Sequence, residues 1–311
     1  MSVPQPMDDI RAQYEALPYP PRDPRDEAIR LITGTPSHIL EINHYLFAGR
    51  LNFRRPFRAL IAGGGTGDAC IMLAQQLVEL NCPAEVVYLD LSSASRAICE
   101  ARAKNRALKN IRFETGSLLD LPAMNLGLFD YIDCAGVLHH LPDPAAAMKT
   151  LADALQPEGG IGVMLYGEHG RSGVHAMQEL LRTLAPPSMA REDRLAMAKR
   201  LIRFLPPTNL FRRNTYINDH VTGGDGGLYD LLLHSVDRAF TVPQIGELAS
   251  GAGLRVVAFL EPVRYEPATY MSDPVIARQA SSLPLLERAA FAERLAGNLR
   301  THVFYATRAG F

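Results

Sequence analysis

The sequence contains little cysteine, no tryptophan and no long apolar run. Its four cysteines, Cys70, Cys82, Cys99 and Cys134, lie without CxxC spacing in 311 residues, which argues against a disulfide framework and a zinc site. We interpret them as buried thiols. No set of histidines and carboxylates has the spacing of metal ligands, so no metal is expected. No apolar run reaches the roughly 18 residues of a membrane helix.

The sequence also lacks an excess of charge of either sign. Its 32 Lys and Arg residues balance 33 Asp and Glu residues, for a net charge of −1. Without surplus positive charge, binding to nucleic acid through bulk electrostatics is not expected. The first ten residues have neither the basic nor the apolar segment of a secretory signal, so a cytoplasmic protein is predicted. A hydrophobic fraction of 47% with 21% charged residues is typical of a globular protein.

Strand and helix patterns alternate along the first half of the chain. An apolar run ending in a glycine cluster precedes a segment with helical periodicity, and the same alternation then repeats. This pattern predicts an α/β fold: a doubly wound, mostly parallel, seven-stranded sheet whose ligand lies at the carboxyl ends of the strands. The strands are expected at residues 58–62, 85–90, 110–114, 128–135, 161–166, 254–260 and 301–307, and the helices of the first half at 69–80, 94–108 and 143–155.

Proline-rich and glycine-rich stretches divide the chain into four predicted parts. The first is a helical extension with an extended, proline-rich connector. The second is the sheet core, the third a helical cap insertion that contains a glycine-rich turn, and the fourth returns to the sheet with a further helical insertion. Their boundaries are residues 1–57, 58–167, 168–240 and 241–311.

The glycine cluster after the first strand has the spacing GxGxG, formed by Gly63, Gly65 and Gly67. Glycines at such a turn let the backbone approach a ligand closely. Asp68 stands where a dinucleotide fingerprint needs its third glycine, which disfavours a nicotinamide enzyme, and no GK[ST] follows, which excludes a Walker loop. Asp90 closes the next strand, where a carboxylate accepts hydrogen bonds from a ribose diol. A simple tight turn and a helix cap are the alternatives for these two features.

Five blocks in this order resemble class I S-adenosylmethionine-dependent methyltransferases. They are ALIAGGGTGDA (59–69), VVYLDLS (86–92), FETGSLLDLP (113–122), FDYIDCAGVLHHLPDP (129–144) and LQPEGGIGVMLYG (155–167). The resemblance implies that S-adenosylmethionine is the cofactor. It implies that the glycines surround the methionine part and the ribose, that Asp90 binds the ribose hydroxyls, and that Leu91 packs on the adenine.

The sequence departs from the family pattern at two positions. Many members have an acidic residue two positions before the first glycine, where this chain has Ile61. The ammonium group of the cofactor must then be bound by carbonyl groups or by another side chain. Ser117, followed by Leu118, stands where an Asp usually contacts the adenine amino group, and its hydroxyl is a weaker acceptor. These departures motivate a second hypothesis, a non-catalytic cofactor-binding or interaction module.

Histidines provide the candidate catalytic groups. His139 and His140 follow the fourth strand at the predicted ligand edge, although a structural role in the loop is an alternative. His234 lies beside Asp237 and Arg238 after the glycine-rich turn, an arrangement that suits a substrate-facing lid, with a surface ion pair as the alternative.

Tyr14 and Tyr19 lie in the proline-rich N-terminal segment, which the resemblance predicts to close over the cofactor. Such aromatic rings stack or donate hydrogen bonds while excluding water, or they pack the segment onto the sheet. The chain beyond the expected sheet surrounds this mouth, so the sequence predicts transfer of a methyl group to an enclosed, small-molecule acceptor. A protein side chain is the alternative acceptor, and the sequence indicates neither the methylated atom nor the oligomeric state.

Overall fold

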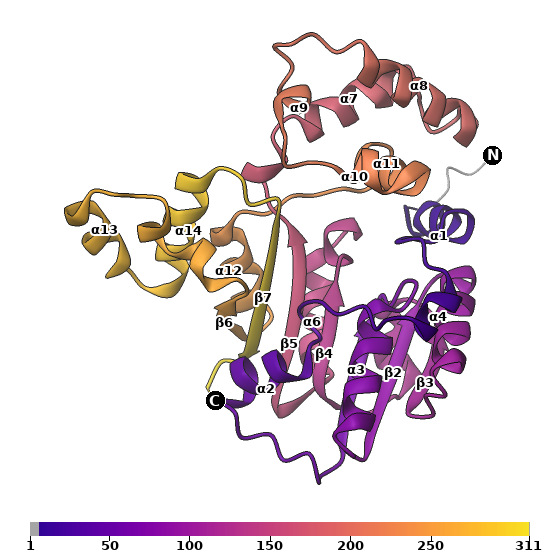
Figure 1. Cartoon of the computed structure of the whole chain (residues 1–311), viewed down its shortest axis with the longest axis vertical. Helices are drawn as coiled ribbons and strands as arrows, with labels where there is room; N and C mark the ends of the chain where they lie inside the picture. Colours follow the sequence, from indigo (N-terminus) through magenta and orange to yellow (C-terminus); the bar gives the residue numbers. More distant parts are fainter. Residues whose placement is uncertain (1–5, 311) are drawn as a thin grey trace.

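A computed structural model describes residues 6–310 of the chain, with the side chains described from residue 10 onward. Its centre is a seven-stranded sheet with the strand order β3-β2-β1-β4-β5-β7-β6 (Figure 1). β1 to β5 are parallel, and β7 runs antiparallel to both β5 and β6. The strands are β1 Phe57–Ala62, β2 Ala84–Asp90, β3 Ile111–Thr115, β4 Phe129–Ala135, β5 Leu155–Tyr166, β6 Leu254–Phe259 and β7 Thr301–Arg308. The predicted fold class is confirmed.

Helices cover both faces of the sheet because successive residues of each buried strand point to opposite sides. Leu60 packs into one apolar core and its neighbour Ile61 into the other. The helices against the first core are α5 Leu121–Met124, α6 Pro144–Asp153, α12 Val242–Gly251 and α14 Leu285–Ala296. Those against the second core are α2 Ile39–Phe47, α3 Asp68–Glu79 and α4 Ser93–Asn105. α13 Pro274–Ser281 contacts α14 at the far edge (Figure 1).

The insertion between β5 and α12 forms a separate layer above the sheet (Figure 1). It has its own apolar core, built mainly from α7 Val174–Leu184, α8 Arg191–Arg203 and α11 Gly224–Leu232. Two short helices complete it, α9 Leu210–Arg213 and α10 Asp219–Thr222. The N-terminal helix α1 Pro6–Ala16 lies beside α4, and a proline-rich loop connects it to the 3-10 helix Pro24–Ala28.

Two predicted boundaries are wrong. β5 begins at Leu155 instead of residue 161, because Leu155 pairs with Phe129 before an irregularity in the ladder. The glycine-rich stretch 222–227 is not one turn: Thr222 ends α10, Gly223 links the two helices, and residues 224–227 begin α11. Its glycines permit close packing, since a Cβ atom on Gly227 would lie 2.4 Å from the carbonyl oxygen of Asp219.

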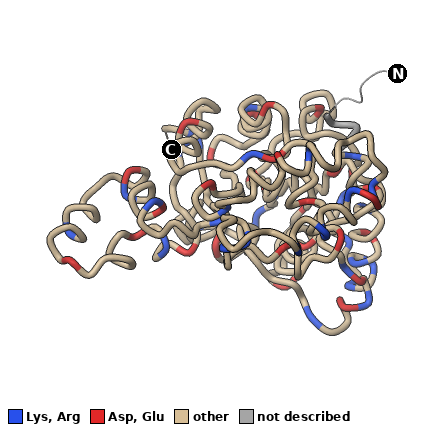
Figure 2. The backbone as a smooth tube through the Cα atoms, turned by 90° about the horizontal axis from the view of Figure 1, so that it is seen from above, with Lys and Arg blue, Asp and Glu red and all other residues tan. Residues whose placement is uncertain are grey.

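Positive and negative side chains are interspersed over the molecule (Figure 2). This distribution agrees with the net charge of −1. None of the helices in the described part of the chain is both long and apolar enough to span a bilayer.

Candidate active site

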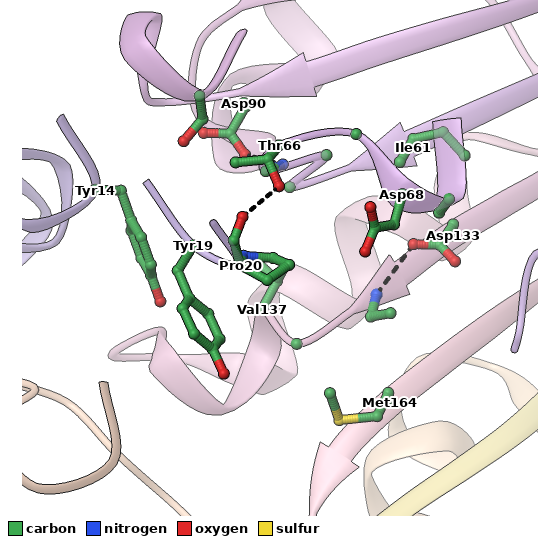
Figure 3. Close-up of a pocket in the computed structure, with 18 of the residues that line it drawn as sticks. Tyr14, Tyr19, Pro20, Ile61, Thr66, Asp68, Asp90, Asp133, Val137 and Met164 are labelled. Atoms are coloured by element: carbon green, nitrogen blue, oxygen red, sulfur yellow. Dashed lines mark hydrogen bonds between the residues drawn. The ribbon is translucent and has the colours of Figure 1, made fainter. Parts of the chain in front are cut away.

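A cavity of about 390 Å³ lies at the carboxyl ends of β1, β2 and β4 (Figure 3). This is the switch point at which the chain, having added β2 and β3 on one side of β1, returns to add β4 on the other. Ligands of doubly wound folds bind at this place. The sheet supplies the glycine turn, Asp90 and Asp133 to the cavity wall, and the N-terminal segment supplies Tyr14 and Tyr19.

The glycine turn needs its glycines for both conformation and space. Gly63 and Gly67 have φ angles of +81° and +102°. A Cβ atom on Gly63 would lie 2.2 Å from the side chain of Val137, and one on Gly67 would lie 2.3 Å from Sγ of Cys99. Other residues at these positions would therefore be strained and would collide with the next layer. Gly65, between them, also has a positive φ and lines the cavity.

Asp90 connects the glycine turn to the start of α4. Its Oδ2 accepts a hydrogen bond from the amide of Gly65 at 2.7 Å, and its Oδ1 accepts one from the amide of Ser92 at 2.8 Å. Its surroundings raise the pKa of Asp90 by desolvation, which these amides partly offset. The carboxylate lines the cavity and also fixes the loop before α4, whose N-cap is Ser92.

The adenine end of the predicted site is apolar. Leu91, Ser117 and Leu118 line the cavity there. The Ser117 hydroxyl accepts a hydrogen bond from the amide of Leu119 at 3.1 Å and so caps a short 3-10 turn. Its O–H group remains able to donate to a ligand nitrogen.

The N-terminal segment closes the cavity from the side opposite the sheet (Figure 3). The hydroxyl of Thr66, in the glycine turn, donates to the carbonyl of Pro20 at 2.8 Å. The hydroxyl of Ser92 donates to the carbonyl of Tyr14 at 3.1 Å. Tyr14 and Tyr19 therefore face the cavity from a segment that is hydrogen-bonded to the glycine turn and to α4.

A buried cluster of charges fastens this segment to the core. Arg22 binds both carboxylate oxygens of Asp68, at the start of α3. Arg102 binds the same Asp68 at 2.7 Å and Glu27 at 2.7 Å, and its side chain is only 1% exposed. Arg106 also pairs with Glu27. In the sequence, Asp68 stands out only because it replaces the third glycine of a dinucleotide fingerprint. Its ion pairs with two arginines that are far apart in the chain could not be predicted from that pattern.

These features fit an adenosyl cofactor, and the comparisons with known proteins agree. Residues 60–161 match the family model described as a methyltransferase domain. Residues 60–161 form a class I methyltransferase domain. For this domain, the predicted methyltransferase family and its cofactor, S-adenosylmethionine, are confirmed.

Two sequence relatives and one solved structure show the extent of the similarity. The chain is 30% identical over 267 residues to an uncharacterised protein of Synechococcus sp., covering 83% of this chain and 61% of that protein. It is 26% identical over 104 residues to a ubiquinone biosynthesis O-methyltransferase of Albidiferax ferrireducens, covering 30% of this chain and 41% of the relative. The structure of PKMT2 from Rickettsia typhi in complex with AdoHcy superimposes with a TM-score of 0.68 at 16% identity, over 89% of this chain and 53% of that one.

The chain thus spans about three fifths of the first relative and about half of the solved chain. At 16% identity the structural likeness establishes the fold. The activity of the whole protein and the acceptor of a methyl group are therefore inferred from the geometry of the site.

Asp230 is the centre of a polar cluster where the cap meets the sheet. It accepts hydrogen bonds from the hydroxyl of Tyr14 at 2.8 Å and from that of Tyr166 at 2.9 Å. Nε2 of His140 lies 3.8 Å from its Oδ1. Burial raises the pKa of Asp230, but His140, His234 and the two hydroxyls outweigh it, so the pKa is lowered. Asp230, Tyr14, Tyr166 and His140 all line the cavity.

Hydrogen bonds to Val236 fix the tautomers of the two histidines in this cluster. Nδ1 of His140 lies 2.8 Å from the carbonyl oxygen of Val236, which only accepts, so this nitrogen carries a proton. Nδ1 of His234 accepts from the amide of Val236 at 3.1 Å. Burial, together with the neighbouring His140, lowers the pKa of His234 to about 3. His234 is therefore neutral with its proton on Nε2, whereas a neutral His140 has a free lone pair on Nε2.

The fold also brings together three groups that the spacing along the sequence did not suggest. The ligating atoms of His140, Asp230 and His234 lie within 4.8 Å of one another. The prediction that the chain has no group of histidines and carboxylates placed like metal ligands is therefore wrong. Because Nδ1 of His234 is already bonded and its Nε2 is protonated, this histidine offers no free lone pair. The arrangement is better suited to moving a proton than to holding a metal ion.

Three candidate catalytic residues, His139, His234 and Arg238, lie outside the cavity lining. His139 is fully buried and stacks on Tyr166 at 3.8 Å, and burial holds its pKa well below the usual value. Neither of its ring nitrogens has a hydrogen-bond partner among the described residues. Arg238 is exposed, and its predicted neighbour Asp237 pairs with Arg171 at 2.7 Å. The expected cluster of His234, Asp237 and Arg238 is therefore divided between different environments.

Proposed function

We propose that this methyltransferase transfers a methyl group from S-adenosylmethionine to a small, enclosed O–H or N–H acceptor whose proton is taken by His140. The observation that carries this proposal is the position of Nε2 of His140. His140 lines the same cavity as the glycine turn and Asp90. Because its Nδ1 donates to the carbonyl of Val236, the neutral ring has its lone pair on Nε2.

The cofactor would be held by residues from both sides of the cavity. On the sheet side these are Gly63, Gly65, Gly67, Asp90, Leu91, Ser117 and Leu118, and on the N-terminal side Tyr19. When bound, S-adenosylmethionine supplies an electrophilic methyl group. The remaining work of the protein is to position the acceptor, exclude water and accept a proton.

His140 has the surroundings of a general base. As the acceptor reacts, its O–H or N–H proton would pass to Nε2 of His140, and the resulting imidazolium would lie 3.8 Å from the Asp230 carboxylate. The carboxylate would then face the positive charge that develops on the ring during transfer. The hydroxyls of Tyr14 and Tyr166 hold Asp230 in place.

The enclosure of the cavity supports a small acceptor. The N-terminal segment covers one side, and the cap contributes Asp230 from another. A protein side chain would have to enter through these same elements, and it remains the alternative acceptor. A non-catalytic module is the other alternative, in which the cofactor binds but no methyl group moves.

Titration calorimetry with S-adenosylhomocysteine tests the cofactor site. The wild-type protein should bind, and Asp90→Ala should lose most of the affinity because both the ribose contact and the Gly65 hydrogen bond are removed. Arg238→Gln, outside the cavity, is the matched control. Failure of the wild-type protein to bind either S-adenosylhomocysteine or S-adenosylmethionine would refute the proposal.

Transfer itself is tested with a cell extract and methyl-labelled S-adenosylmethionine, followed by mass spectrometry. A labelled small molecule would support the proposed acceptor class. A labelled polypeptide would establish the alternative acceptor, and tight cofactor binding without any labelled product would favour the non-catalytic module.

A further inference from the structure

β1 has an apolar residue where the family pattern has an acidic one, and the neighbouring strand carries the acid instead. In the parallel ladder between β1 and β4, Ile61 is paired with Asp133. Residues paired in register on adjacent strands project to the same face of a sheet. Both line the cavity, and Figure 3 shows them on neighbouring strands near Asp68.

The Asp133 carboxylate is buried, with a relative exposure of 2%. Its Oδ2 accepts from the Ser37 hydroxyl at 2.6 Å, and its Oδ1 from the amide of Ala135 at 3.2 Å. Each oxygen keeps a further lone pair, so the carboxylate is able to accept more hydrogen bonds.

No positive charge in the described part of the chain compensates Asp133. No Lys, Arg or His there forms an ion pair with it, and the titratable groups that feel its charge are phenols and thiols, Tyr131, Tyr305, Cys70 and Cys134. Desolvation raises the pKa of Asp133 to about 6, against the opposing bonds from Ser37 and Ala135. A buried carboxylate without a cation is costly, so this side of the cavity suits a positively charged ligand group.

Asp68 is the other carboxylate on this side of the cavity, but its charge is already compensated by ion pairs. It is bound by both Arg22 and Arg102. Asp90 lies at the end of β2 and bonds the amides of Gly65 and Ser92. Among these three carboxylates, Asp133 is thus the one near Ile61 whose charge is not compensated by an ion pair.

We propose that Asp133 binds the α-ammonium group of S-adenosylmethionine, in place of the acidic residue that β1 lacks. This inference rests on the proposed function, and it makes Asp133 a residue that contacts the cofactor. Ser37 orients the carboxylate from the segment that precedes α2.

Calorimetry with two ligands tests the proposal. S-Adenosylhomocysteine carries the ammonium group, whereas 5′-methylthioadenosine has the adenosine and the thioether but no amino acid part. Asp133→Asn preserves the shape of the side chain and removes its charge. It should therefore lower the affinity for S-adenosylhomocysteine by about 10- to 100-fold, the contribution expected of a hydrogen bond to a charged group. Its affinity for 5′-methylthioadenosine should stay within about twofold of the wild type.

A matched variant, Ser37→Ala, removes the hydroxyl but keeps the charge, and it should cost much less S-adenosylhomocysteine affinity than Asp133→Asn. Unchanged S-adenosylhomocysteine binding by Asp133→Asn would overturn the inference. So would an equal loss for both ligands, or an equal loss in Ser37→Ala, because either result assigns Asp133 a purely structural role. If the wild-type protein binds neither ligand, the proposed function itself fails and the inference falls with it.

Discussion

The hydroxyl of Tyr166, at the end of β5, donates a hydrogen bond to Asp230 of α11 at 2.9 Å. This bond joins the last parallel strand of the sheet to the cap. Tyr14 reaches the same carboxylate from the N-terminal helix, so three separate parts of the chain meet at one buried charge. His140 lies next to it, and the position of this base therefore depends on all three parts being in place.

Replacing His140 by Ala should slow methyl transfer by about 10²- to 10⁴-fold, the usual contribution of a general base. S-Adenosylhomocysteine affinity should change little, because the proposed role of His140 is toward the acceptor and not toward the ribose or methionine part of the cofactor. Incorporation of labelled methyl groups measures the rate, and calorimetry measures the affinity. Arg238→Gln provides the control with normal activity, and a His140→Ala rate equal to it would contradict the assigned role.

Glu27→Gln should destabilise the protein by about 2–3 kcal/mol, since it removes the carboxylate that pairs with Arg106 and with the buried guanidinium of Arg102, which then keeps the ion pair with Asp68. Arg102 and Glu27 have side chains that are 1% and 2% exposed. Urea denaturation measures the change in the free energy of unfolding. The matched control is Asp23→Asn in the same segment, where the partner Arg25 is 88% exposed and no loss is expected. Equal stability of the two variants would show that the buried cluster does not fasten the segment.

Gly67→Ala should cost about 2 kcal/mol or more and weaken S-adenosylhomocysteine binding. The cause is the φ of +102° together with the contact that a Cβ atom would make with Cys99. Gly251→Ala, at the end of α12 and with nothing within 4 Å of the added atom, should be neutral or stabilising by up to about 1 kcal/mol. Thermal unfolding and calorimetry distinguish the two, and wild-type behaviour of Gly67→Ala would contradict the packing described.

Asp133→Asn should stabilise the ligand-free protein at neutral pH. The pKa of Asp133 is raised from 3.8 to about 6 by burial, so its ionisation favours the unfolded state. The cost is absent below about pH 4, grows as the pH rises to about 6, and is then constant, reaching at most about 3 kcal/mol. Unfolding measured from pH 4 to pH 8 should show the variant gaining over the wild type across this range. A variant that is less stable at pH 8 would show that the charge is already compensated in the folded protein.

The fold was predictable because the strands carry a strong local signal. β1, β2 and β4 each contain a short apolar run. The glycine turn after Ala62 combines two requirements, positive φ and close packing, that only one residue type meets. The start of β5 was missed, since pairing of Leu155 with Phe129 is a tertiary effect. The glycines that begin α11 were read as a turn because their packing against α10 is not visible in the sequence.

The site was predictable where a motif spans a few residues and unpredictable where distant segments meet. Asp90 ends β2 and Ser117 lies two residues after β3, and both line the cavity. Adjacent residues in the LHH block do not share an environment, since His140 lines the cavity and His139 stacks beneath it on Tyr166. The role of Asp133 depends on its register with Ile61, more than 70 residues away in sequence, and that of Asp230 on contacts with Tyr14 and Tyr166.

The N-terminal segment contacts both the glycine turn of the predicted cofactor site and the polar cluster around Asp230. The carbonyl of Pro20 accepts a hydrogen bond from Thr66 in the glycine turn. The hydroxyl of Tyr14 donates one to Asp230, next to His140. If this segment moves away to let spent cofactor leave, the Tyr14 hydroxyl leaves Asp230 in the same movement. In kinetic terms, cofactor exchange and the resetting of the proposed base would then share one opening event, so the motion of a single stretch of chain would order turnover.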